Sequence, residues 1–213
     1  MYAFDRSEHA GDLTKRAQLK AHLDSAPMKK KLRGPIGSDK YLDWNEVRKL
    51  ISQTPKRDPK LSPIIEFFAR SGVRVAELVG ICLTDIKMNG KKAYIRIHGK
   101  GGIERTIEVE KKFVAGVIEF YGGSTWLFEH NGRQYSPNSI TNRIKVVSEF
   151  ILGKRISSHA LRHSYARHQI VDLHRSAKAV ANQLGHSSTA ITLDFYVEDE
   201  ATGDPLMPTE DKD

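Results

Sequence analysis

Residues 93–109 alternate apolar and polar side chains on both sides of a glycine-rich turn, and segments with helical spacing flank them. The alternating runs are 93–98 and 105–109, and Lys100 lies at the tip of the turn between them. A period of two in two short runs around glycines predicts an antiparallel β-hairpin. The pattern therefore predicts an α+β fold that is mostly helical and has one small antiparallel sheet.

The segments around this hairpin predict a series of helices. Asp43 can cap a first helix, and Pro63 is favourable early in a second one, in which residues 64–69 are almost all apolar. Gly72 ends that helix, and a third, short helix is expected to carry Arg74. Further helices are expected near 111–121, 137–150, 158–171, 175–184 and 188–197, and a short strand at 126–128.

The sequence contains neither a candidate membrane-spanning segment nor a pair of cysteines that could form an internal disulfide. No apolar run reaches the ~18 residues that a membrane-spanning helix needs, and the N-terminus lacks the apolar core of a secretory signal. The single cysteine, Cys82, excludes an internal disulfide and is typical of a reducing compartment. It lies in the apolar run 78–83, which predicts a packed rather than a reactive thiol. We expect a cytoplasmic protein.

The net charge of +8 is divided unevenly along the chain. Residues 198–213 hold seven acids and one base, so residues 1–197 carry 33 bases and 19 acids, a net charge of +14. Such an excess is typical of proteins that bind a polyanion, although a merely soluble basic protein has it too. We divide the chain into a basic segment or linker at 1–40, a folded domain at 41–197 and an acidic tail at 198–213.

His159 and Arg162 lie three residues apart in a predicted helix and are expected to share a face. An imidazole beside a guanidinium can hold a phosphate, because arginine presents a planar fork of donors. His159 and His163 also have the i,i+4 spacing of a zinc-binding helix, but the sequence lacks the glutamate of a metalloprotease helix and a cysteine cluster. A third interpretation is that His159, Arg162 and His163 are ordinary surface residues without a ligand.

Three other positions are each open to an ordinary structural interpretation. Arg74 can pair with Glu77, either as a surface pair or as a semi-buried arginine that needs a partner or an anion. His186 is expected in a turn after the helix C-cap Gly185, where a histidine is usually just polar. Tyr196 is expected at a helix end, where a tyrosine is usually half-buried core. Taken together, these cations, histidines and tyrosine have the chemistry for attack on a phosphodiester without a metal.

The segments 71–78, 99–105, 159–163 and 184–188, followed by Tyr196, occur in this order within residues 42–200. In these segments the chain resembles the catalytic domain of tyrosine recombinases, the phage integrase family. The resemblance implies a site-specific DNA recombinase, of the integrase or excisionase type, that acts on double-stranded DNA. Such enzymes cut and rejoin DNA through a 3′-phosphotyrosyl intermediate and use neither a metal nor a cofactor.

The resemblance also implies catalytic roles for Arg74, Lys100, His159, Arg162, His186 and Tyr196. Tyr196 would attack the scissile phosphate. Arg74 and Arg162 would hold its non-bridging oxygens, and Lys100 would protonate the departing 5′-oxygen.

The two histidines of the set would assist this reaction. His186 would add a further donor to the phosphate, and His159 would assist proton transfer at the tyrosine. His163, which follows Arg162, would lie behind the residues that contact the phosphate. In this family the segment after the tyrosine often docks on a neighbouring subunit, which implies a homotetramer on two DNA sites; a disordered solubilising tail is the alternative.

The chain departs from the family's usual plan at its N-terminus. Residues 1–41 are too few for the helical core-binding domain that most members place first, so the chain is expected to be either a single-domain recombinase or a catalytic portion. A type IB topoisomerase and a non-catalytic DNA-binding regulator on the same fold are the competing functions.

Overall fold

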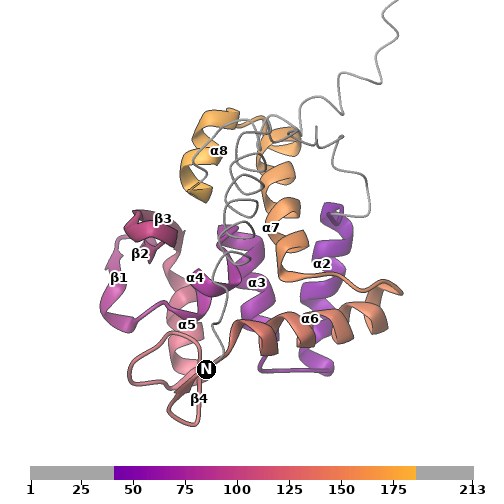
Figure 1. Cartoon of the computed structure of the whole chain (residues 1–213), viewed down its shortest axis with the longest axis horizontal. Coiled ribbons are helices and arrows are strands. Elements are labelled where there is room, and N and C mark those ends of the chain that lie inside the picture. The colour runs from indigo at the N-terminus through magenta and orange to yellow at the C-terminus, as the bar shows by residue number, and fades with distance from the viewer. Residues whose placement is uncertain (1–40, 186–213) are drawn as a thin grey trace, which may run out of the picture. The chain divides into compact units, whose positions relative to one another are not determined.

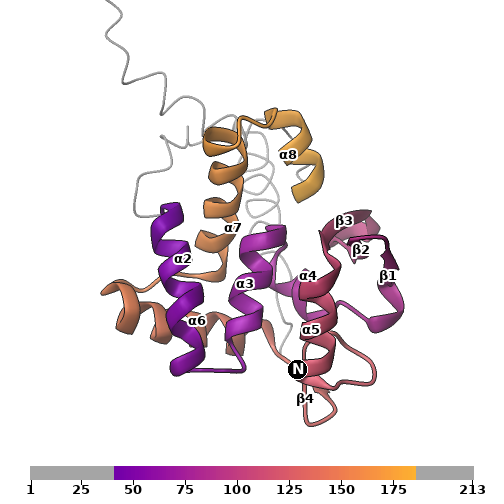
Figure 2. The same cartoon turned by 180° about the vertical axis from the view of Figure 1, so that it is seen from behind.

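The computed structural model describes residues 41–185, apart from the side chain of Lys100. The predicted basic segment 1–40, the predicted helix at 188–197 and the acidic tail lie outside this range. Helix α3, Ser62–Ser71, lies near the middle of the described part (Figure 1). In both views α2 and α7 lie on one side of α3, and α5 and the sheet lie on the other (Figure 2).

Local signals set the bounds of the first helices. Helix α2, Trp44–Gln53, begins with a capping box in which Glu46 N donates to Asp43 Oδ1 at 2.9 Å. Helix α3 has Pro63 in its first turn and ends at Gly72, whose φ of 64° is the left-handed conformation that suits glycine. Both caps were expected from the sequence. Helix α4, Val75–Val79, follows, with Arg74 as its N-cap rather than inside it.

The predicted hairpin forms the larger part of a three-stranded antiparallel sheet. Strands β2, Lys92–His98, and β3, Glu104–Glu110, pair with Ile95 opposite Ile107. The edge strand β1, Ile86–Asn89, pairs with β2 and was not predicted from the sequence. Its burial pattern is weak because three of its four residues are exposed. The Asn89–Gly90 dipeptide, a common tight-turn signal, marked the connection to β2.

The strand predicted at 126–128 is wrong. Trp126 makes a single antiparallel bridge with Cys82, while the consecutive residues Leu127 and Phe128 are both buried in the core. Two neighbours that both face the core do not have the alternation of a half-buried strand. The next strands, β4 at Glu129–His130 and β5 at Arg133–Gln134, form a minimal hairpin.

The remaining helices close the core and were expected within a few residues of their bounds. They are α5, Lys111–Tyr121; α6, Pro137–Leu152; α7, Ser158–Arg167, which continues as a π-helical turn, His168–Asp172; and α8, Ala177–Leu184. Within residues 41–185, every helix is too short or too polar to span a bilayer.

Helix α7 packs directly on α3, and this packing positions the functional residues. Leu161 and Tyr165 of α7 are buried. A Cβ atom on Gly72 would lie 2.3 Å from Cδ1 of Tyr165, so only glycine permits the approach. The backbone after α3 is thereby brought against the middle of α7, where Arg162 lies.

Candidate functional site

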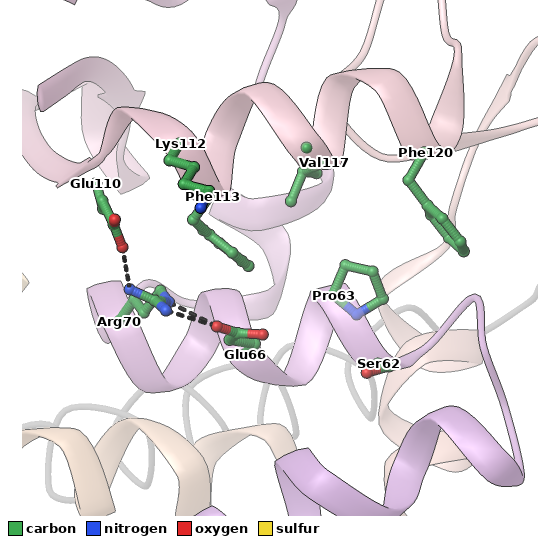
Figure 3. Close-up of a pocket in the computed structure, with 10 residues that line it drawn as sticks. Ser62, Pro63, Glu66, Arg70, Glu110, Lys112, Phe113, Val117 and Phe120 are labelled. Atoms are coloured by element: carbon green, nitrogen blue, oxygen red, sulfur yellow. Dashed lines mark hydrogen bonds and ion pairs between the residues drawn. The ribbon is translucent and has the colours of Figure 1, made fainter. Parts of the chain in front are cut away.

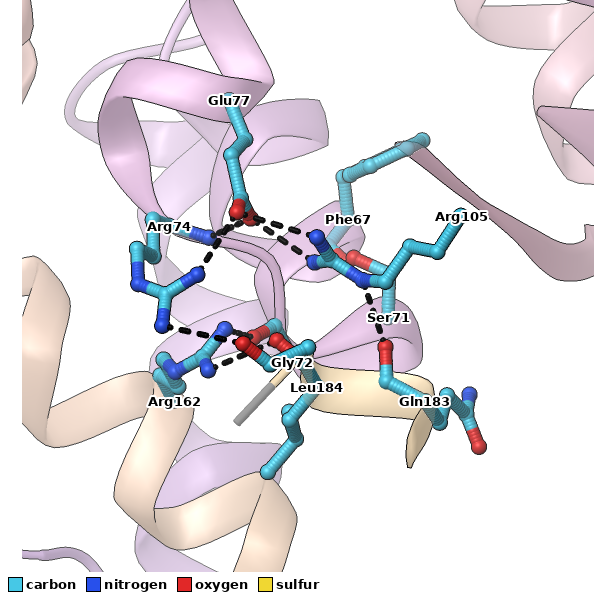
Figure 4. A network of polar contacts seen from close by, with 10 residues as sticks. Phe67, Ser71, Gly72, Arg74, Glu77, Arg105, Arg162, Gln183 and Leu184 are labelled. Atoms are coloured by element: carbon cyan, nitrogen blue, oxygen red, sulfur yellow. Dashed lines mark hydrogen bonds and ion pairs between the residues drawn. The ribbon is translucent and has the colours of Figure 1, made fainter. Parts of the chain in front are cut away.

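Three arginines from distant parts of the chain converge around Glu77 and the C-terminal end of α8 (Figure 4). Arg74 precedes α4, Arg105 lies in β3, and Arg162 lies in α7. Within residues 41–185, this cluster therefore combines three guanidinium groups with one carboxylate, and its formal charge is positive.

Glu77 is the centre of the cluster, and its side chain is only 4% exposed. Its carboxylate accepts hydrogen bonds from the backbone and Nη1 of Arg74, each at 2.8 Å, and from both Nη atoms of Arg105, at 3.0 and 2.8 Å. Burial alone would raise the pKa of Glu77, but the hydrogen bonds from Arg105 and Arg74 outweigh burial and lower the pKa to about 2. Glu77 is therefore ionised at any physiological pH.

Arg162 is almost fully buried, with 3% exposure. Its Nη1 donates to the Gly72 carbonyl at 2.7 Å and its Nη2 to the Leu184 carbonyl at 2.9 Å. Burial lowers the pKa of Arg162 to about 9, and the positive charges of Arg74 and Arg105 act in the same direction. The guanidinium thus stays protonated at neutral pH, in a place where an anion would be favourable.

The C-terminal end of α8 supplies carbonyl acceptors to all three arginines. Arg105 Nε donates to the Gln183 carbonyl at 2.7 Å, and Arg74 Nη2 reaches the Gly185 carbonyl at 3.4 Å, beside the bond from Arg162 to Leu184. Cations are favourable at this end of a helix because its free carbonyls carry partial negative charge. Gly185 ends α8 with a φ of 67°, which confirms the predicted C-cap.

The structure brings some of the predicted site residues together, and others lie outside the described range. Arg74 and Arg162 are brought together, and Arg74 is 39% exposed and paired with Glu77, which confirms the expected semi-buried pair. Lys100 lies in the turn Lys100–Gly102 between β2 and β3, as predicted. His186 and Tyr196 lie outside the described residues, and so does the spacing between them.

His159 and Arg162 lie in the same helix but differ in solvent exposure. His159 is exposed in the first turn of α7, whereas Arg162 is buried, so the two do not present an equally accessible face. The His159 ring meets the ring of His163 edge-on, with centroids 4.4 Å apart. No group of three or more His, Cys, Asp and Glu residues within the described range could hold a metal ion, so these two histidines have no third ligand of that kind there.

Arg105 is a member of the cluster that was not predicted from the sequence. Its side chain is 11% exposed, and it lies on the same face of β3 as the buried residues Ile107 and Val109. The period of two therefore contained a signal, because it placed a charged residue on the inward face of the strand. A buried charge of this kind needs partners, and here Glu77 and the Gln183 carbonyl supply them.

A separate groove of about 520 Å³ lies between α3 and α5 (Figure 3). Its arginine, Arg70, is paired with Glu66 at 2.7 Å and with Glu110 at 3.2 Å, and it lies over the ring of Phe113. Two carboxylates surround one guanidinium there, so the groove lacks the positive charge of the Glu77 cluster.

Comparisons with known proteins agree with this architecture. Residues 40–202 match the model of the phage integrase family. The tyrosine recombinase XerC of Pelobacter propionicus is 31% identical over 187 residues, which are 81% of this chain and 59% of the relative. Across the first relatives that match, the chain spans about half of their length.

Solved structures share the fold. The XerH site-specific recombinase bound to difH substrate matches with a TM-score of 0.64 and 20% identity, covering 76% of this chain and 52% of that one. A lambda integrase tetramer bound to a Holliday junction matches with a TM-score of 0.63 and 18% identity, covering 84% and 56%. The mostly helical α+β fold with a small antiparallel sheet is therefore confirmed, and the two-stranded β4–β5 hairpin is an addition to it.

Proposed function

This chain belongs to the phage integrase family, and from that premise we propose that it cuts and rejoins double-stranded DNA at specific sites through a covalent tyrosine–DNA intermediate. The observation that carries the proposal is the arginine cluster. Within residues 41–185 it places three guanidinium groups around one carboxylate, and the buried Arg162 lacks a carboxylate of its own. A phosphodiester supplies the negative charge that such a cluster favours.

The proposed reaction balances without a metal or a cofactor. The phenolic oxygen of Tyr196 forms a bond to phosphorus, and the bond between phosphorus and the 5′-oxygen breaks. The phenolic proton passes to His159, and Lys100 gives a proton to the departing 5′-oxygen. A second strand end reverses these steps and restores the DNA.

The two arginines assigned to the phosphate have complementary properties. Arg74 is partly exposed and is held at Nη1 by Glu77, so the rest of its guanidinium can meet a non-bridging oxygen. Arg162 is buried and oriented by two carbonyls, so its charge is fixed in direction before DNA arrives. Donors that are oriented in advance stabilise the charge that develops in the transition state. We assign His186 as a further donor to the same oxygens.

We further propose that the active assembly is a homotetramer on two DNA sites. The lambda integrase structure that shares this fold is a tetramer on a Holliday junction, and the XerH structure is bound to its DNA substrate. The excess of basic residues suits DNA, because each phosphate that is neutralised releases counterions. The recombinase names of the relatives favour this function over a type IB topoisomerase or a non-catalytic regulator.

Covalent capture tests the proposal directly. Nicked duplexes cut from the DNA that flanks this gene are incubated with the protein, and complexes that resist detergent are sequenced. We expect adducts with the wild-type chain and none with Tyr196→Phe, while both retard the duplex in a gel. Adducts that persist in Tyr196→Phe refute the assignment of the nucleophile, and relaxation of supercoiled plasmids without any captured site favours a topoisomerase.

Lys100 has a separate test. Lys100→Ala is expected to slow cleavage of an ordinary duplex and to recover on a duplex with sulfur in place of the bridging 5′-oxygen, because a thiolate leaves without a proton. A rate that stays low on the sulfur substrate refutes the role of Lys100 as the acid.

A further inference from the structure

Arg105 uses its guanidinium differently from the two arginines assigned to the phosphate. Each of its three nitrogens donates to the protein: Nε to the Gln183 carbonyl, and Nη1 and Nη2 to separate oxygens of Glu77. Its side chain is 11% exposed, against 39% for Arg74. Arg105 is therefore the less exposed of the two, and its guanidinium points toward Glu77 and Gln183 (Figure 4).

These bonds join three segments that carry proposed catalytic residues. Arg105 follows Lys100 by five residues in the same hairpin. Arg105 donates to Glu77, which also orients Arg74. It also donates to the carbonyl of Gln183, at the end of α8 that precedes His186 in the sequence. A Cβ atom on Gly185 would lie 3.0 Å from Arg105 Nη1, so the guanidinium also packs closely against that helix end.

We propose that Arg105 is a positioning residue that fixes Arg74 through Glu77 and fixes the end of α8 next to His186. The inference rests on the proposed function, because it assigns Arg105 to the DNA-cleavage site. Arg105 itself does not contact the phosphate. It divides the charge of Glu77 between two arginines, so that the Glu77 carboxylate does not compete fully with the phosphate for Arg74.

Removing Arg105 would change the cluster in two ways. The formal charge of the three guanidiniums and one carboxylate in the described cluster would fall from +2 to +1, which weakens the field at the phosphate. The pKa of Glu77 would also rise, because burial remains while its side-chain hydrogen bonds from Arg105 are lost. Arg74 still faces Glu77 directly, Arg162 lies at longer range, and Arg96 and His98 line a small cavity beside it.

The test compares Arg105→Gln and Arg105→Lys with a matched control, Arg143→Gln, in the full chain. Arg143 makes a similar two-point pair, with Asp58, but lies in α6 outside the cluster. Glutamine removes the charge, whereas lysine keeps the charge but cannot reach three acceptors with one planar fork. Thermal melting of all three variants establishes that they are folded before any activity is compared.

The first measurement is the rate of covalent capture on the duplexes described above, at saturating protein, together with the affinity for the same duplexes. We expect Arg105→Gln to cleave about 10- to 100-fold more slowly than wild type, since small misplacements of catalytic groups have effects of this size. DNA affinity should change by less than about threefold, because the loss lies mainly in the transition state. Arg105→Lys should be intermediate.

The second measurement needs no DNA. Hydrogen exchange of amides 181–185 should speed up in Arg105→Gln and stay unchanged in Arg143→Gln, because Arg105 binds the Gln183 carbonyl whereas Arg143 binds Asp58. This arm separates the inference from the proposed function. If wild type forms no adduct with any duplex, the proposed function fails, while exchange at α8 still decides whether Arg105 holds this end.

Equal cleavage by Arg105→Gln and Arg143→Gln, with unchanged exchange at α8, overturns the inference. A deficit that comes from weaker DNA binding, with the rate of cleavage at saturating protein unchanged, reduces Arg105 to a structural contact and also overturns it. If Arg105→Gln does not fold, Arg105→Lys is judged by the same two measurements. A lysine variant that matches wild type in both refutes the inference, because the planar guanidinium of Arg105 is then not needed to position Glu77 and α8.

Discussion

Replacing Glu77 with glutamine removes the carboxylate that Arg74 and Arg105 share while keeping the shape of the side chain. The pKa of Glu77 is about 2, against an ordinary value of 4.5. Each pKa unit corresponds to about 1.4 kcal/mol, so ionised Glu77 stabilises the folded state by about 3 kcal/mol relative to its protonated form. Glutamine imitates the protonated form, so we expect Glu77→Gln to lower the free energy of unfolding by about 3 kcal/mol at pH 7.

The loss has a defined pH dependence. Because the pKa of Glu77 is lower in the folded state than in the unfolded state, its stabilisation is fully present above pH 4.5 and disappears as the pH falls towards 2. Wild type therefore loses this contribution on acidification, and Glu77→Gln has none to lose. At pH 3 the difference between the two proteins should be less than half of its value at pH 7.

Urea unfolding followed by the fluorescence of Trp44 and Trp126 measures both values. Asp58→Asn is the control, because Asp58 also pairs with an arginine but its side chain is more exposed, at 21% against 4% for Glu77. We expect it to cost about 1 kcal/mol or less. A loss below about 1 kcal/mol for Glu77→Gln at pH 7, or an equal difference at pH 7 and pH 3, would refute the reasoning.

Three further substitutions or reactions test the local structure. Gly72→Ala should cost about 2–4 kcal/mol in thermal unfolding, because its Cβ would collide with Tyr165 at a φ of 64°, whereas the control Gly90→Ala, with nothing within 4 Å, should cost about 1 kcal/mol from backbone strain alone. Asp43→Ala should cost about 1 kcal/mol through loss of the α2 cap, and an unchanged melting temperature would contradict the capping box. Burial raises the pKa of the Cys82 thiol, so it should react with a disulfide reagent more slowly at pH 8 when folded than in urea; equal rates would contradict the packed thiol.

Much of the secondary structure could be predicted because its signals are local. The Asp43 cap, Pro63 at the start of α3 and the alternation of β2 and β3 each act within a few residues. Strand β1 was missed because an exposed edge strand leaves little hydrophobic pattern. The strand at 126–128 was wrong because Leu127 and Phe128 are both buried by surrounding elements, which a local pattern does not reveal.

The sequence by itself determined most of the helices, the β2–β3 hairpin and the charged side chains available for a phosphate, including Arg74 and Arg162. Only the tertiary structure decided which arginines share Glu77 and the end of α8. Arg105 and Glu77 are 28 residues apart, and the bond from Arg162 to the Gly72 carbonyl spans 90. Such pairings depend on the packing of α3, α7 and β3 around one core. Because the effective dielectric constant is low in a packed environment, the charges of these side chains interact there more strongly than they would on an exposed surface.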